Sequence, residues 1–279
     1  MKVSEIKSNA ARMLTIRQLN VDLTQGFPRH WLGGDAFRTQ LFNAQSFSFP
    51  IGEQYFIDSL RAALPLVSDP LLRAQVKGFI GQEAAHRHIH AQYNAQLNLQ
   101  GHRYFLEPFV AWRIRSSEHI GVKRKVAVTM AYEHFTAIFA DGILSDSQWV
   151  GDAVEPMKTL WTWHSVEETE HKSVAFDVYR AIGGGYVARI GWFIYVTAIL
   201  SLDTTIQTMH CLYQDGSLFK AKTMLSALKF YFGRNGLIRF SLPHFLAYFR
   251  PGFMPWQRDN LDLAEQWSND HSDAYRAIK

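Results

Sequence analysis

The sequence has a single cysteine, Cys211, among its 279 residues. One cysteine excludes an internal disulfide bond and any zinc or iron–sulfur site built from several cysteines. A chain without disulfides is typical of a reducing compartment, so we expect a cytoplasmic protein. The net charge is also small: 29 Lys and Arg against 25 Asp and Glu give +4. With no recognisable binding module beside it, this excess does not indicate a nucleic-acid partner.

Long hydrophobic runs are absent as well. The N-terminus mixes charged and apolar residues throughout, so we expect no secretory signal. The most apolar segment, residues 183–202, has Arg189 as its only charge but is interrupted by Gly191, Thr197 and Ser201. Its longest unbroken stretch is roughly half of what a spanning helix needs. We expect a buried helix there, with a helix lying on a membrane surface as the alternative.

The composition predicts a folded, helical chain. Hydrophobic residues make up 47% and charged residues only 19%, which excludes a disordered protein. Long β-branched alternations are missing, so we predict an all-α fold in one domain over residues 1–279. It comprises an irregular lead-in with short strand-like pieces (1–50), a four-helix bundle (51–182) and a helical extension (186–279). The predicted helices are 52–64, 70–99, 117–144, 152–181, 186–213, 218–232, 236–248 and 258–277.

Four predicted helices of the bundle each carry a glutamate, and two of them add a histidine three residues later. A single Glu-x-x-His pair is a weak signal. One Glu from each of two helices plus a Glu-x-x-His pair from each of the other two is the ligand set of di-iron and di-manganese bundles. The alternative is a helical scaffold held together by salt bridges. In chain order the candidate ligands are Glu53, Glu83, His86, Glu133, Glu168 and His171.

Helical geometry selects among the acidic residues of the last bundle helix. At about 100° per residue, His164, Glu168 and His171 fall at roughly 0°, 40° and 340°, on one narrow stripe. Glu167 and Glu170 lie about 60–120° off that stripe. We therefore select Glu168 as the ligand candidate of this helix, and expect Glu167 and Glu170 to support the ligands or to face solvent.

Two further histidines adjoin the motifs. His90 shares a stripe of about 60° with Glu83 and His86, so it is a candidate eighth ligand, a hydrogen-bond partner or a surface histidine. His134 follows Glu133 directly and points about 100° away from it, which argues against a ligand role. Carboxylates with a few imidazoles and no thiolate favour iron or manganese over structural zinc.

These residues resemble the ferritin-like di-iron superfamily over roughly residues 51–180. More narrowly, the stretches GQEAAHRHIHAQYN, WHSVEETEHKSVAFDVY and FRPGFMPWQRDNLDLAEQW resemble the bacterial family labelled "predicted metal-dependent hydrolase". The pattern His-x-x-x-Glu-x-x-His is similar to the arylamine N-oxygenases, whose di-iron site uses four Glu and three His. Carried over, that resemblance implies a metal centre of Glu53, Glu83, His86, Glu133, His164, Glu168 and His171.

Three functions are compatible with this centre. The first is a non-haem di-iron oxidase or oxygenase, which uses O2 and an external electron donor to oxidise a small, apolar organic substrate. The second is a hydrolase that uses a hydroxide bridging two manganese or zinc ions. The third is a non-catalytic metal-binding protein. In the enzymatic cases, aromatic residues beside the motifs are candidates to line a dry pocket: Tyr55, Phe56, Tyr93, Tyr132, Phe135, Trp161, Trp163 and Phe176.

The C-terminal extension interleaves basic and aromatic residues. We expect it to pack on the bundle and cover the pocket, with contact to an anionic membrane or a lipid-like substrate as the alternative. Homodimer formation is left open. The residues concerned are Lys220, Lys222, Lys229, Arg234, Arg239 and Arg250, with Phe230, Tyr231, Phe232, Phe240, Phe245 and Phe249 between them.

Overall fold

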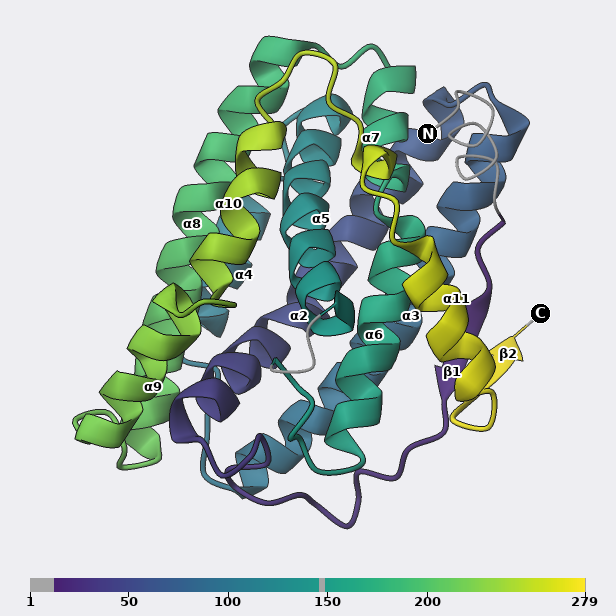
Figure 1. Ribbon diagram of the computed structural model, residues 1–279. Coiled ribbons are helices and arrows are strands. Elements are labelled where there is room, and N and C mark those ends of the chain that lie inside the picture. Colours follow the sequence, from purple (N-terminus) through teal and green to yellow (C-terminus); the bar gives the residue numbers. More distant parts are fainter. Residues whose placement is uncertain (1–12, 146–148, 279) are drawn as a thin grey trace.

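The computed structural model describes residues 13–145 and 149–278 (Figure 1). The prediction of an all-α protein is confirmed, apart from one small sheet in which β1 and β2 pair antiparallel, with Ile16 opposite Ile278. In chain order the elements are β1 (Ile16–Leu19), α2 (Ala36–Ala63), a 3-10 turn (Leu64–Leu66), α3 (Pro70–Leu99), α4 (Glu107–Ser116), α5 (Val122–Ser145), α6 (Met157–His171), α7 (Val174–Ala181), α8 (Tyr186–Gln214), α9 (Ala221–Phe232), α10 (Leu237–Ala247), a second 3-10 turn (Pro255–Gln257), α11 (Leu261–Asp270) and β2 (Tyr275–Ile278).

The long helices α2, α3, α5 and α6 pack together as a bundle, and α7 continues the line of α6 (Figure 1). The interior of the bundle has two apolar clusters, one at each end of the bundle. One cluster contains Phe42, Tyr93 and Trp161, and the other contains Phe79 and Phe176. Helices α2, α3 and α5 each cross from one cluster to the other, and α6 followed by α7 does so together, so a middle layer lies between the two apolar clusters. That middle layer is where the predicted metal ligands fall.

Several helix limits differ from the sequence-based expectation. The first bundle helix begins at Ala36 rather than near residue 52, so the lead-in assigned to 1–50 is helical over its last part. Asp35 caps this helix by accepting a hydrogen bond from the backbone N–H of Arg38, and Pro50 lies inside it. Proline is a strong breaker in local sequence reasoning, but packing along the whole bundle overrides it here. The start of α3 at Pro70 is confirmed, with Asp69 as its cap.

Other corrections concern the later helices. The helix expected over 117–144 begins later, at Val122, and helix α4, which was not expected, precedes it and ends at Ser116. The expected helix over 152–181 is interrupted after His171, where Lys172 donates a hydrogen bond of 2.6 Å to the carbonyl of Arg258. The last helix ends at Asp270, and the chain then forms β2 instead of continuing as a helix to 277.

Helices α8, α9 and α10 of the extension cover one side of the bundle, whereas α11 packs against α6 on the other (Figure 1). Helix α8 packs against α2 and α5, α9 packs against α2, and α10 packs against α5 and α9. Only 17% of the most apolar 18-residue stretch of α8 is buried, so the expectation of a buried helix holds for one side only. Phe193 and Val196 face the interior, whereas Val187 is 82% exposed. Among the described helices, α8 alone is long and apolar enough to cross a membrane by length and composition.

A glycine on α5 makes room for a large side chain. A Cβ atom added to Gly142 would lie 2.6 Å from the ring of Trp149, whose side chain is almost fully buried. Glycine in a helix interior costs about 1 kcal/mol relative to alanine, so its place here reflects packing rather than helix propensity. This contact fixes the end of α5, the helix that carries Glu133.

We expect Gly142→Ala to destabilise the protein by about 1–3 kcal/mol, because the indole ring has no free space into which to move. Thermal unfolding followed by circular dichroism measures this change. Gly191→Ala is the matched control, since Gly191 is also inside a helix and an added Cβ meets no atom within 4 Å. The control is expected to be neutral or slightly stabilising, and equal losses in both variants would contradict the packing argument.

Candidate metal centre

All eight histidine and glutamate candidates lie together in the middle layer of the bundle. Each of the four long helices contributes at least one of them, and each of these residues is at most 4% exposed. Within this layer, groups of three residues have ligand atoms within 4.8 Å of one another. By helix, the residues are Glu53 on α2, Glu83, His86 and His90 on α3, Glu133 on α5, and His164, Glu168 and His171 on α6.

One group forms around His171. Its Nε2 atom lies 3.1 Å from Oε1 of Glu83 and 3.4 Å from Oε2 of Glu133. The same nitrogen is 3.4 Å from Oε2 of Glu168. Three carboxylates from three helices therefore converge on one imidazole nitrogen. Phe79 packs against the ring of His171 at a centroid distance of 4.7 Å and helps to enclose this side.

A second group forms around His164 and His86, whose rings stack at a centroid distance of 4.1 Å. Nε2 of His164 lies 3.0 Å from Oε1 of Glu168, and Nδ1 of His86 lies 3.6 Å from the same oxygen. Glu53 joins this side through its grouping with Glu83 and His86. Glu83 thus belongs to both sides, and Glu168 turns one oxygen toward each.

Hydrogen bonding within the described part of the chain leaves many of these atoms unsatisfied. Both carboxylate oxygens of Glu53, Glu83 and Glu133 are buried without a hydrogen-bond partner there, as are Oε2 of Glu168 and Nε2 of His171. Unpaired polar groups in a protein interior are costly. Cations at this position would satisfy them, so the residues fit a metal site.

The pKa directions describe the same crowding of charge. Burial, reinforced by Glu83 and Glu168, raises the pKa of Glu53 well above its ordinary value. Burial and the charge of Glu168 do the same for Glu133. Burial alone would also raise the pKa of Glu168, but contact with His171 and His164 outweighs it and lowers that pKa well below the ordinary value. Strong shifts of opposite sign among neighbouring carboxylates are typical of functional sites.

His90 is a buried neighbour of a candidate ligand, so its interpretation as a surface histidine is wrong. Its Nε2 lies 2.7 Å from Nδ1 of His164, and its Nδ1 lies 2.9 Å from the hydroxyl of Ser46. That hydroxyl in turn donates to Oδ1 of Asn94 at 2.8 Å. His90 also groups with Glu53 and His164 within ligand range. Its hydrogen-bond geometry favours the role of a partner that orients His164.

Glu167 and Glu170, which lie outside the ligand stripe, support the outer ring nitrogens of His86 and His171, Glu167 directly and Glu170 through Gln82. Glu167 is fully buried, and its Oε2 lies 3.1 Å from Nε2 of His86. Nδ1 of His171 lies 3.0 Å from Oε1 of Gln82, whose amide donates to Glu170 at 3.0 Å. The expectation that Glu167 and Glu170 support the ligands is thereby favoured over solvent exposure.

Arg17 on β1 connects these two supports. Its guanidinium donates to Glu170 at 2.8 Å from both terminal nitrogens and to Glu167 at 3.3 Å. Hydrogen-bonded partners of this kind fix the ring orientation of metal-binding histidines. Sequence reasoning missed Arg17, because it lies 150 residues from Glu167 along the chain and on no shared helix face.

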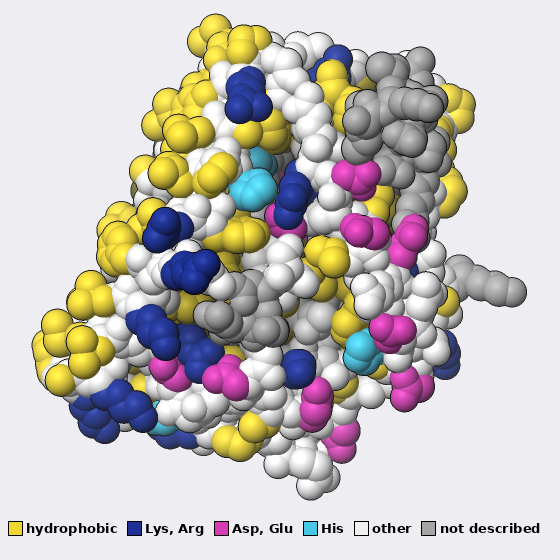
Figure 2. All heavy atoms as spheres, in the orientation of Figure 1, with side chains coloured by type: hydrophobic (Ala, Val, Ile, Leu, Met, Phe, Trp, Pro, Cys, Tyr) yellow, Lys and Arg dark blue, Asp and Glu magenta, His cyan; other side chains and the backbone are white. Residues whose placement is uncertain are grey.

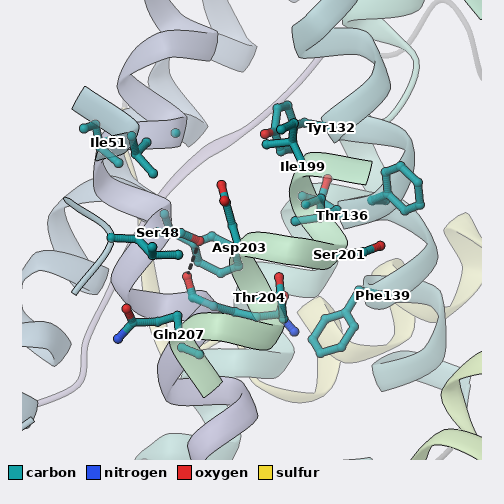
Figure 3. A pocket seen from close by; sticks show the side chains of 18 of the residues that line it. Ser48, Ile51, Tyr132, Thr136, Phe139, Ile199, Ser201, Asp203, Thr204 and Gln207 are labelled. Carbon is teal, nitrogen blue, oxygen red and sulfur yellow. Dashed lines mark hydrogen bonds between the residues drawn. The ribbon is translucent and has the colours of Figure 1, made fainter. Parts of the chain in front are cut away.

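A large apolar cavity of about 1260 Å³ opens beside the cluster. Glu53, His164 and Glu168 form part of its wall, whereas Glu83, Glu133 and His171 do not. Figure 3 shows side chains of α2, α5 and α8 surrounding it, among them Ser48, Tyr132 and Asp203. Of the aromatic residues expected to line a pocket, Tyr55, Phe56, Tyr132, Phe135 and Trp161 do so, while Tyr93, Trp163 and Phe176 pack in the core instead.

A bundle of long helices that buries carboxylates and imidazoles around an apolar cavity defines a helical protein with a candidate metal centre. Residues 15–259 match the family model described as "predicted metal-dependent hydrolase", so the chain belongs to that family. This description supports the hydrolytic alternative better than the oxidase or oxygenase expected first. No curated protein and no solved structure matches the chain, so the ferritin-like topology and the likeness to N-oxygenases stay predictions.

We expect Glu168→Gln to abolish metal binding at one or both positions, because this residue faces both groups of ligands. Glu167→Gln leaves every candidate ligand in place and removes only the support of His86, so a loss of about 10–100-fold in affinity is expected. Isothermal titration of the metal-free protein with Mn²⁺ measures both variants. Equal losses from the two substitutions would contradict the assignment of faces.

Metal removal is expected to lower the thermal stability of the native protein. A metal present at 100 times its dissociation constant stabilises the folded state by about 2.7 kcal/mol. For a chain of this size, that corresponds to a rise of roughly 5–10 °C in Tm. Differential scanning calorimetry with chelator, Mn²⁺ or Mg²⁺ tests this, with Mg²⁺ as the control, since it prefers water and all-oxygen sites. An unchanged Tm with Mn²⁺ would argue against a metal site.

Proposed function

We propose that this chain is a dimetal enzyme that transforms an apolar organic molecule held in the cavity beside the metal centre. One observation carries the proposal: Glu53 and Glu168, two members of the buried carboxylate–histidine cluster with unsatisfied oxygens, form part of the wall of a large apolar cavity. A purely structural metal site needs no such cavity. Concave, apolar sites with a few convergent polar groups are the usual form of a ligand site.

The residues divide into two sets of ligands with shared members. Glu83, Glu133 and His171 would hold one ion. His86, His164 and Glu53 would hold the other, and Glu168 faces both sets with one oxygen each. Bundles with this donor set hold iron or manganese pairs. Such ions supply Lewis acidity and, when they are redox-active, electrons for O2.

Hydrolysis is the first candidate reaction, and the family description supports it. The cavity wall limits which substrates fit, because most of its lining residues are apolar or aromatic. An ester or amide with a long apolar chain would leave that chain in the cavity and bring its carbonyl to Glu53, His164 and Glu168. The chain's own task is then to position the carbonyl and to exclude bulk water.

Oxidation by O2 with an external electron donor is the second candidate. The specific observation in its favour is the donor set, four carboxylates and three imidazoles without a thiolate, in a site that is nearly sealed from solvent. A dry, apolar surrounding protects reactive intermediates from side reactions with water. Iron is the metal implied by this reaction, whereas manganese or zinc suffices for hydrolysis.

Metal analysis and two activity assays separate the candidates. We expect two metal ions per chain after loading the metal-free protein with Fe²⁺, Mn²⁺ or Zn²⁺ under nitrogen. If the enzyme hydrolyses esters, Mn²⁺- or Zn²⁺-loaded protein cleaves nitrophenyl esters of long acyl chains faster than the acetate, with or without air. If it is an oxidase, Fe²⁺-loaded protein consumes O2 with a reductant present, and long-chain additives increase the rate.

The matched variants are Glu168→Gln, which removes a candidate ligand, and Glu118→Gln, which changes an exposed carboxylate outside the cavity wall. The first should reduce either activity at least 100-fold, and the second should leave it unchanged. Fewer than one bound ion per chain would overturn the dimetal proposal. Two ions with neither activity on any chain length would overturn the enzymatic part and favour a non-catalytic metal-binding protein.

A further inference from the structure

The outward side of α8 carries no charge. All residues of this helix are described, and each exposed one between Tyr186 and Tyr213 is uncharged. A helix on the surface of a soluble globular protein normally places charged residues on this side. The exposed residues are Tyr186, Val187, Ala188, Gly191, Ile194, Tyr195, Ala198, Ser201, Leu202, Thr205, Met209 and Tyr213.

Neighbouring helices extend this uncharged side into a broad surface. Phe219, just before α9, is 87% exposed, and Leu225 on α9 is 67% exposed. On α10, Leu246 is 56% exposed, and on α4 Trp112 is also 56% exposed. Figure 2 shows the hydrophobic side chains along the edge formed by α8, α9 and α10. Exposed apolar patches of this extent mark interaction sites. We call the exposed apolar residues of α4, α8, α9 and α10, together with Phe219, the apolar face.

Positive charge borders the apolar face. Residues 216–258 contain seven Lys and Arg but no Asp or Glu. Lys222 and Lys229 are exposed on α9 beside Leu225 and Leu228. Figure 2 shows basic side chains around the lower end of this edge, near α9. Apolar side chains bordered by basic residues are typical of surfaces that bind anionic lipid bilayers.

The cavity opens at the same face. Several of its lining residues are also strongly exposed, namely Phe109 and Trp112 on α4 and Tyr195 and Met209 on α8. The cavity therefore runs from the apolar face inward to Glu53, His164 and Glu168. A long-chain molecule could move along this path without contact with bulk water.

Internal bonding and charge argue against other occupants of this face. Buried Arg189 donates to the carbonyls of Tyr248 and Arg250, and Gln207 donates to the carbonyl of Arg103, so α8 is fastened to the fold by polar bonds. Such a helix is held in place and is not free to enter a bilayer alone. The basic border favours an anionic partner over a second copy of this chain, since each copy carries a net charge of +4.

We propose that the apolar face docks on the surface of an anionic membrane, and that the cavity receives a lipid or another long-chain molecule directly from it. The docking stands independently of any reaction. The identity of the substrate class rests on the proposed function. Docking places the cavity mouth at the bilayer, and the substrate chain then reaches the metal centre without crossing water.

Vesicle flotation with the full chain tests docking, in metal-free and metal-loaded form. We expect binding to phosphatidylcholine vesicles that contain phosphatidylglycerol, and much weaker binding to phosphatidylcholine alone. Lys222→Glu with Lys229→Glu should weaken binding at least about 20-fold, since each basic residue near the surface contributes about 1 kcal/mol. Leu225→Ser with Leu228→Ser should weaken it through lost apolar contact. Lys77→Glu with Lys158→Glu, exposed on α3 and α6, is the control and should have no effect.

Several outcomes would overturn docking. They are equal binding to neutral and anionic vesicles, equal weakening by the control pair, or retention after an alkaline carbonate wash, which indicates insertion. A dimer in sedimentation that the Leu225 and Leu228 variant converts to a monomer would assign the face to a second copy. Vesicle binding without any turnover would support docking and contradict the proposed function. Turnover without vesicle binding would support the proposed function and contradict docking.

Discussion

Four carboxylates that converge in the middle of an apolar bundle set the constraint on which the rest of the structure depends. These carboxylates are almost fully buried, so their negative charge must be balanced inside the protein. Imidazoles balance part of it, which explains why the pKa of Glu168 is lowered while those of Glu53 and Glu133 are raised. Bound cations would satisfy the carboxylate oxygens that remain without a partner. Apolar clusters on both sides then hold the layer at a fixed depth.

The small sheet at the edge of the bundle helps to support this buried cluster. Strand β2 pairs with β1 and so fixes the place of Arg17, whose guanidinium joins Glu167 and Glu170. Through these two acids, one arginine supports the outer nitrogens of His86 and His171 on two different helices. The two ends of the described chain thus meet where they can orient the candidate ligands.

The candidate site was readable from the sequence because its spacing is local. Glu168 and His171 are three residues apart on one helix, so their shared face follows from the helix period alone. The start of α2 at Ala36 was not readable in this way, since Pro50 signals a break that only packing along the bundle overrides. The role of Arg17 could not be predicted for a related reason, because its partners are distant in sequence. The exposed side of α8 was anticipated only as the alternative to a buried helix, because composition cannot distinguish a buried helix from one that is apolar outside.

The two sides of the centre differ in their access to the cavity, and this asymmetry bears on how such a site works. Glu53 and His164 lie at the cavity wall, while the side built around His171 is closed by Phe79. A molecule in the cavity therefore meets one set of ligands directly and the other only through Glu168, which belongs to both. Under the proposed function, the open position would contact the substrate, and the enclosed position would hold the charge of the shared carboxylates.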